Sequence, residues 1–122
     1  MTPGGLSSAY CKERGWRSGR VDSWIPGARI TRDLFGFADL LVFMDGGAGI
    51  LLVQATSAPN VSARVKKLLE SDLAREWVAE GNRAEVWGWS KVPRKGRGAL
   101  TAPDLTTKDG RYRLRRVRFT SK

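Results

Sequence analysis

Two polar residues interrupt segments that are otherwise apolar, and they are the strongest candidates for chemistry in this chain. Asp39 stands within FADLLVFM at residues 37–44, and Gln54 stands within ILLVQAT at residues 50–56. A carboxylate in a buried strand is unfavourable unless it is paired or holds a cation. Gln54 and Thr56 are two residues apart, so they project from the same face of a strand.

The two apolar segments are expected to form a β-hairpin, because the glycine-rich turn DGGAG separates them. Their nearly continuous apolarity predicts burial on both faces, as in the centre of a sheet covered by helices. In simple register, the start of the first strand meets the end of the second. Asp39, Gln54 and Thr56 are then expected to converge at one end of the sheet.

Helices and further strands are expected around this hairpin. The predicted helices cover residues 6–14, ended by Gly15, and 61–80, with a restart at Ser71. Strands are predicted at 21–25 and 84–89, where Trp87 and Trp89 share a face. Residues 28–35 and 91–107 are predicted to be loops.

The C-terminal segment is predicted to be a basic strand. Residues 111–120 alternate polar and apolar side chains, but the alternation changes phase at residues 115–116. A bulge at that point would place all four apolar side chains on one face, namely Tyr112, Leu114, Val117 and Phe119. The expected order is α-β-β-β-α-β followed by this strand.

Charge is concentrated at the C-terminal end. The chain has 22 Lys and Arg against 12 Asp and Glu, a net charge of +10, and residues 91–122 account for +9 of it. Such a balance predicts a polyanionic partner, most often nucleic acid. A ribosome-, virion- or membrane-surface protein could use the same charge. The residues expected to contact phosphates are Arg111, Arg113, Arg115, Arg116 and Arg118.

The composition also excludes several kinds of site. There is one Cys and no His, which excludes a disulfide framework, a Cys/His zinc site and catalysis by Ser-His or Cys-His pairs. No apolar run approaches the ~18 residues of a membrane span, and residues 1–8 do not look like a signal peptide. A cytoplasmic protein is therefore expected.

The spacing Asp39-(x14)-Gln54-Ala55-Thr56, on two adjacent strands between helices, resembles the motif of the PD-(D/E)XK nuclease superfamily. The more specific similarity, over about residues 6–90, is to its small Holliday-junction-resolvase-like branch and to small proteins common in phages and bacteria. The resemblance implies a restriction-endonuclease-like α/β core at residues 1–90, with a mixed central sheet flanked by helices. Residues 91–122 would then be a basic loop and strand packed on the same single domain.

The resemblance also implies DNA cleavage with Mg²⁺ or Mn²⁺, in a homodimer. In that family an Asp, a following Asp or Glu and a backbone carbonyl bind the cation, and a Lys helps to activate water. Asp39 matches the first Asp, and Ala55 would supply the carbonyl. Gln54 and Thr56 stand where Asp/Glu and Lys are expected, so this chain departs from the motif there.

Neighbouring residues could compensate for these departures. Asp33 could add a carboxylate, and Lys67 or Arg64 could bring positive charge from the following helix. Arg32 and Arg64 are also candidates for contacts with DNA. Together with Asp39, Gln54 and Thr56, the residues Asp33 and Lys67 form the predicted catalytic set, and metal binding is assigned to Asp39, Gln54 and Ala55.

Purely structural roles remain open for the same residues. Asp39 could bond to the backbone or to Arg32, and Gln54 could hydrogen-bond within the core. Asp33 could simply pair with Arg32, and the helix cations could be a solvated surface. In that case the chain is a catalytically inactive DNA-binding or assembly protein of nuclease fold, or an anti-defence protein that binds another protein. The tryptophans Trp77, Trp87 and Trp89 are expected in the core. The sequence predicts no particular role for Trp16 or Trp24.

Overall fold

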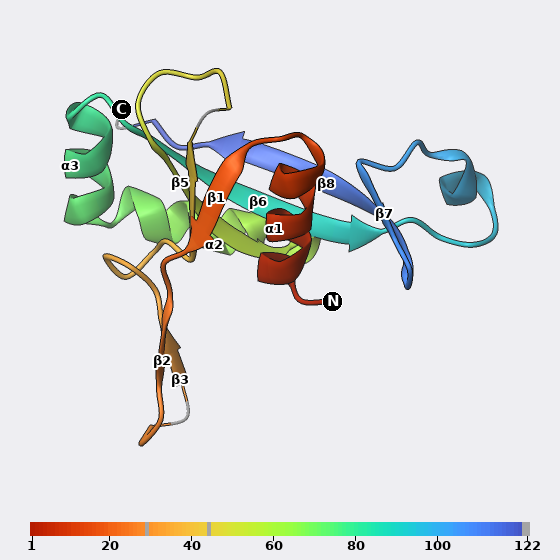
Figure 1. Cartoon of the computed structure of the whole chain (residues 1–122), viewed down its shortest axis with the longest axis horizontal. Helices are drawn as coiled ribbons and strands as arrows, with labels where there is room; N and C mark the ends of the chain where they lie inside the picture. The colour runs from red at the N-terminus through yellow and green to blue at the C-terminus, as the bar shows by residue number, and fades with distance from the viewer. Residues whose placement is uncertain (29, 44, 121–122) are drawn as a thin grey trace.

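The computed structural model describes residues 1–28, 30–43 and 45–120, and in this part three helices pack on a six-stranded mixed sheet (Figure 1). The sheet is strongly curled into a half-barrel, and its strand order is β1-β4-β5-β6-β8-β7. The strands are β1 (Arg17–Arg20), β4 (Leu40–Phe43), β5 (Leu51–Ser57), β6 (Arg83–Lys91), β7 (Leu105–Thr107) and β8 (Gly110–Arg118).

The central hairpin forms as predicted. Strands β4 and β5 are antiparallel, with Leu40 opposite Val53 and Val42 opposite Leu51. Leu52 and its two neighbours in β5 have no exposed surface. The predicted end of the first strand, Met44, lies outside the described residues. Burial on both faces, which the apolar run indicated, is confirmed.

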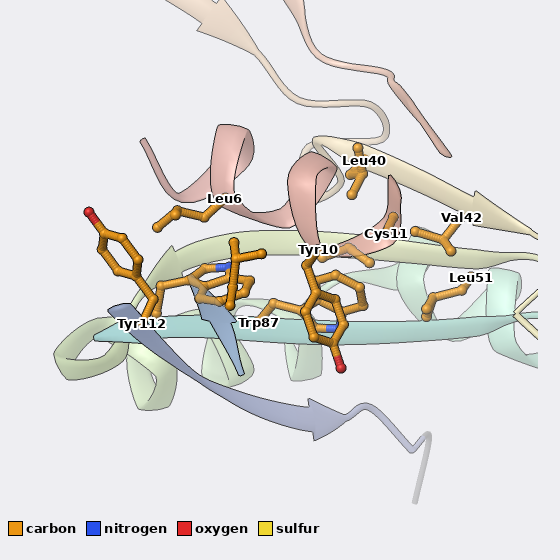
Figure 2. Packing of buried hydrophobic residues seen from close by; sticks show 11 residues of the cluster. Leu6, Tyr10, Cys11, Leu40, Val42, Leu51, Trp87 and Tyr112 are labelled. Carbon is orange, nitrogen blue, oxygen red and sulfur yellow. The ribbon is translucent and has the colours of Figure 1, made fainter. Parts of the chain in front are cut away.

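Helices cover both faces of this hairpin. Helix α1 (Pro3–Glu13) packs on one face, and α2 (Val61–Leu69) and α3 (Asp72–Ala79) pack on the other (Figures 1 and 2). The predicted restart at Ser71 is confirmed, because its hydroxyl accepts a hydrogen bond from the Ala74 amide at 3.2 Å.

Helix α1 begins three residues earlier than predicted. Thr2 caps it by accepting a hydrogen bond from the Gly5 amide, and Pro3 occupies its first position. The Arg20 guanidinium packs against Gly4 in the first turn of this helix. A Cβ at that position would lie 2.7–2.9 Å from the guanidinium atoms.

The polar strands were the main error of the sequence prediction. The strand predicted at residues 21–25 is present as β2 (Ser23–Ile25). However, β3 (Ile30–Arg32) lies in the predicted loop 28–35, and β1 was not predicted at all. Strand β7 lies within the predicted loop 91–107. Strand β1 is exposed at all four positions at the edge of the sheet, so it has no apolar alternation that sequence analysis could detect.

The predicted bulge in the C-terminal strand is wrong. Strand β8 pairs with β6 in one unbroken register, from Glu85 opposite Arg118 to Lys91 opposite Tyr112. Tyr112 packs in the cluster on the α1 side, whereas Phe119, just beyond the strand, packs in the cluster on the α2 side. The phase change therefore arises because the two halves of one regular strand fill opposite cores.

Strand β6 runs parallel to β5 and carries the predicted aromatic pair. Trp87 and Trp89 are buried on the α1 side, where Tyr10 packs edge-on against both at 5.5 and 5.7 Å between ring centroids (Figure 2). The Trp89 indole donates to the Ser7 hydroxyl at 2.9 Å. These tryptophans are core residues, as expected.

Among the helices of residues 1–28, 30–43 and 45–120, none has the length and apolarity needed to cross a membrane.

The contact between β6 and α2 gives a first testable prediction. A Cβ at Gly88 would lie 2.2 Å from Val61 Cγ2 and 3.2 Å from the Ala58 backbone. Gly88→Ala is therefore expected to lower the free energy of unfolding by about 1–3 kcal/mol, measured by chemical denaturation. The matched control is Gly19→Ala, also in a strand, where a Cβ meets nothing within 4 Å. Equal stability of the two variants would contradict this packing.

Candidate functional site

Asp39 lies just before β4, and the backbone of β5 holds its carboxylate. Both carboxylate oxygens are 3.2 Å from the Ala55 amide nitrogen, which donates to them. The Asp39 amide donates to the Val53 carbonyl at 3.0 Å, and the residue is 8% exposed. The sequence alternative of a backbone contact is thus realised for this carboxylate.

Burial raises the pKa of the Asp39 carboxyl to about 7. The hydrogen bond from Ala55 opposes this effect, the negative charges of Asp33 and Asp22 add to it, and the positive charge of Arg20 opposes it. The carboxyl therefore holds a proton in part of the molecules at neutral pH. A cation bound at its remaining lone pairs would favour the ionised form.

Gln54 lies directly across the hairpin from Asp39, one step beyond the pair formed by Leu40 and Val53. It is 4% exposed, and its amide nitrogen donates to Asp33 Oδ2 at 3.3 Å. Its oxygen, Oε1, is buried and has no hydrogen-bond partner within the described part of the chain. Because an unpaired buried acceptor costs about 1–3 kcal/mol, this oxygen marks a place suited to a ligand atom.

Asp33 connects the central hairpin to helix α2. Besides the amide of Gln54, its Oδ2 faces the ammonium of Lys67 at 3.9 Å. The structure thus brings together Asp33, Gln54 and Lys67, which the sequence predicted for one site. In the described residues, the ionic partner of Asp33 is Lys67 rather than Arg32.

Three further residues that the sequence predicted for the site have less direct contact with it, namely Thr56, Arg64 and Arg32. Thr56 is 5% exposed and lies two positions after Gln54, on the same face of β5. Arg64 lies one turn before Lys67 on α2 and forms no ion pair with any described residue. Arg32 is exposed at the end of β3.

Sequence analysis missed two residues beside this site. Arg20 ends β1 opposite Leu40, and its guanidinium forms two hydrogen bonds to the Asp22 carboxylate at 2.6 and 3.1 Å. Both residues act on the pKa of Asp39. The spacing Arg20-x-Asp22 was the only sign of this pair in the sequence. It could not be interpreted because strand β1, which ends at Arg20, was not predicted.

The C-terminal arginines divide between the two faces of the sheet. Arg113 and Arg115 are exposed on the α2 side, which is also the side of Gln54. Arg115 and Lys66 border a groove of about 270 Å³ between β8 and α2, floored by Val61, Val65 and Val117. This groove combines an apolar floor with a basic rim.

The remaining arginines differ in their surroundings. Arg116 lies on the α1 side, where it binds the buried carboxylate of Glu85 at 2.7 Å and lies over the Trp87 ring at 5.1 Å. Arg111 donates to the Ala99 carbonyl at 3.2 Å, and Arg118 is exposed. Of the five arginines, Arg116 is therefore the one already engaged in a buried ion pair.

The oxygen atoms at the site fit a hard cation such as Mg²⁺. The described residues contain no group of three His, Cys, Asp or Glu side chains placed to hold a metal ion. The available donors are the carboxylates of Asp39 and Asp33 and the unpartnered Oε1 of Gln54. The Ala55 carbonyl faces the same side as its amide, toward Asp39, because both groups of a strand residue point to one neighbour.

No known protein family, curated protein or solved structure matches this chain.

The raised pKa of Asp39 gives a prediction about stability. Between pH 4 and 7 the folded carboxyl keeps a proton that the unfolded chain releases, because the folded pKa is about 7 against an ordinary 3.8. The free energy of unfolding should therefore fall as pH rises through this window, by on the order of 4 kcal/mol at most. In Asp39→Asn this part of the pH dependence should disappear, measured by chemical denaturation in EDTA.

The control for this experiment is Glu13→Gln, which removes an exposed carboxyl at the end of α1. It should leave the slope between pH 4 and 7 unchanged. Identical pH profiles for Asp39→Asn and the wild type would show that Asp39 ionises as freely in the folded chain as in the unfolded one.

Proposed function

We propose that this chain binds DNA and cleaves its phosphodiester bonds with a divalent cation, as a nuclease of the PD-(D/E)XK type. One observation carries the proposal. Asp39, just before β4, and Gln54, on β5, are both buried at the same end of the central hairpin, and the Gln54 oxygen has no hydrogen-bond partner in the described residues. Such an oxygen, beside a carboxylate whose ionised form is disfavoured, is suited to a cation.

The arrangement of the elements supports the proposal. If the β2–β3 hairpin is set aside, the chain runs helix α1, strands β1, β4 and β5, helices α2 and α3, and strand β6. The first three of these strands are antiparallel neighbours, and β6 lies parallel to β5. This reduced order is compatible with the α-β-β-β-α-β order that the resemblance implies, although its first strand is β1 and not the strand predicted at residues 21–25. Asp39 would lie just before the second of these strands and Gln54 on the third.

The chain's own side chains would divide the work. Asp39, the Gln54 oxygen and the Ala55 carbonyl would hold Mg²⁺, which when bound stabilises charge on the phosphate and generates hydroxide near neutral pH. Asp33 fixes the Gln54 amide by accepting its hydrogen bond, and it offers a second carboxylate. The Thr56 hydroxyl would orient water.

Lys67 would replace the missing lysine of the motif. Thr56 carries no charge, but the Lys67 ammonium reaches Asp33 from α2, at 3.9 Å. It therefore brings a positive charge to the polar cluster from a different element. Arg64, one turn earlier on the same helix, would contact the DNA backbone.

DNA would bind along the α2 side of the sheet. Arg113 and Arg115 are exposed there, and phosphate contacts of this kind position a duplex without reading its sequence. Arg32 and Arg111 would extend this basic surface, whereas Arg118, opposite Glu85 in β6, would contact DNA only from the other face of the sheet. A homodimer, which cutting of both strands requires, is also part of the proposal.

The second candidate function is DNA binding without cleavage. It is favoured by the neutral side chains of Gln54 and Thr56, since an amide oxygen binds Mg²⁺ more weakly than a carboxylate and a hydroxyl brings no positive charge. The basic groove between β8 and α2 is unaffected by these substitutions. Cleavage assays separate the two candidates.

Cleavage should depend on Asp39. We expect the wild type to cut labelled duplex, single-stranded or four-way DNA with Mg²⁺ and not with EDTA. Asp39→Asn should lose about 100-fold or more of this activity, since it removes the carboxylate that holds the cation. The variant should still be folded, because the buried group it introduces is neutral. The control is Asp72→Asn, which changes an exposed carboxylate on α3.

Absence of Mg²⁺-dependent cleavage by the wild type, with DNA binding retained, would favour the second candidate. Undiminished cleavage by Asp39→Asn would overturn the assignment of the site.

The salt dependence of binding should identify the DNA-binding face. The double variant Arg113→Gln/Arg115→Gln should reduce the slope of log affinity against log salt concentration by about 2, because each phosphate contact contributes about 0.9. The control of equal charge is Lys12→Gln/Lys108→Gln, which changes two exposed lysines away from the groove. Equal slopes for the two double variants would exclude a specific role for Arg113 and Arg115.

A further inference from the structure

The β2–β3 hairpin is a second, separate sheet that leaves the body of the protein. Its strands pair only with each other in the described structure, with Trp24 opposite Thr31 and Ser23 opposite Arg32. It projects away from the six-stranded sheet and from the helices (Figure 1). An isolated two-stranded hairpin is at best marginally stable in water. A molecule that binds the projecting hairpin would therefore stabilise it.

The base of this hairpin is attached to the candidate site. Arg20, which ends β1, lies opposite Leu40, so the chain enters and leaves the hairpin between neighbouring strands of the main sheet. The Val21 amide donates to the Asp39 carbonyl at 3.1 Å. Asp33 directly follows β3 and accepts the hydrogen bond from Gln54. A molecule lying over Asp39 and Gln54 therefore also meets this hairpin.

The hairpin exposes a large aromatic side chain. Trp24 is 60% exposed, and it lies two residues after Asp22, which is close enough to Asp39 to raise its pKa. Two residues of extended chain span about 7 Å. Trp24 is thus in the middle one of the three residue pairs of the hairpin, one pair away from its base. Tryptophan has a large apolar surface to bury, and the main core leaves this one uncovered.

The charge of the surroundings favours a nucleic acid over an apolar partner. Arg32, opposite Ser23 in the hairpin, is exposed, and the Arg20 guanidinium lies at its base. A base stacked on an aromatic side chain contributes about 1–3 kcal/mol when it is not held in a duplex stack. Arg32 and Trp24 project from opposite faces of the hairpin. An exposed aromatic ring on a hairpin that also carries an exposed arginine, and that is joined to a site suited to a phosphate-bound cation, fits an unpaired nucleotide.

We propose that the β2–β3 hairpin is a DNA-contacting arm and that Trp24 stacks on an unpaired base beside the candidate site. The proposal rests on the proposed function and adds a substrate class to it: DNA in which single strand and duplex meet. The duplex phosphates bind the groove between β8 and α2, and the unpaired base lies against Trp24. Fully paired DNA makes the first contact without the second.

The test measures binding in EDTA, where no cleavage takes place. The probes are a labelled blunt duplex and the same duplex with a single-stranded extension. Trp24→Ala should weaken binding to the extended duplex by about 5- to 150-fold and leave binding to the blunt duplex within about twofold. Trp24→Phe should restore most of the loss. Leu100→Ala, at another strongly exposed apolar residue, should bind both probes like the wild type.

Fluorescence gives an independent readout of stacking. The extended duplex should quench the tryptophan emission of the wild type more than that of Trp24→Phe, and the difference should vanish with the blunt duplex. Equal losses on the two probes, or no loss on either, would overturn the proposal. So would an unchanged affinity for DNA in a Trp24→Ala variant that has lost self-association, since the hairpin would then join two copies of the chain.

Failure of this proposal is distinguishable from failure of the proposed function. If Trp24→Ala binds both probes normally while Asp39→Asn still abolishes cleavage, only the role of the hairpin is wrong. If wild type cleaves no DNA but Trp24 is needed for binding the extended duplex, the nuclease assignment fails and the binding arm stands. If the wild type binds neither probe, both are wrong.

Discussion

Strand β5 is covered by α1 on one face and by α2 on the other, so every polar group in it must find a partner inside the protein. The Ala55 amide finds one in the Asp39 carboxylate, and the Gln54 amide finds one in Asp33. These two contacts fix the end of the central hairpin and the base of the β2–β3 hairpin. The Gln54 oxygen is the exception, because it has no hydrogen-bond partner among the described residues.

The same two-sided burial organises the charge of the molecule. Because β8 continues the sheet beside β6, alternate side chains along it point to opposite faces. On the α1 side, Arg116 forms an ion pair with the buried Glu85, and this contact contributes to the stability of the fold. On the α2 side, Arg113 and Arg115 have no such buried partner in the described residues, and Arg115 belongs to the basic rim of the groove between β8 and α2. A basic strand thus contributes to the core with one face and leaves its arginines exposed on the other.

The parts of the fold predicted from sequence are those with a strong apolar pattern. The β4–β5 hairpin, the helix break at Ser71 and the burial of Trp87 and Trp89 all follow from such patterns. A polar strand such as β1 has none, since its position is set by hydrogen bonding to a neighbour rather than by burial. The proximity of Asp39 and Gln54 could be predicted from the hairpin register, but Arg20 and Asp22 could not, because they depend on the polar strands.

The neutral residues of β5 have a physical explanation in this arrangement. A carboxylate and an ammonium at positions 54 and 56 would both be buried, and each would carry a large desolvation penalty. Asp33 and Lys67 bring the same two charges to Gln54 from half-exposed positions, on the loop after β3 and on α2. Water can solvate those positions in part, so the charges are retained at a lower penalty. Under the proposed function, the departures of Gln54 and Thr56 from the nuclease motif would be a redistribution of charge among neighbouring elements rather than its loss.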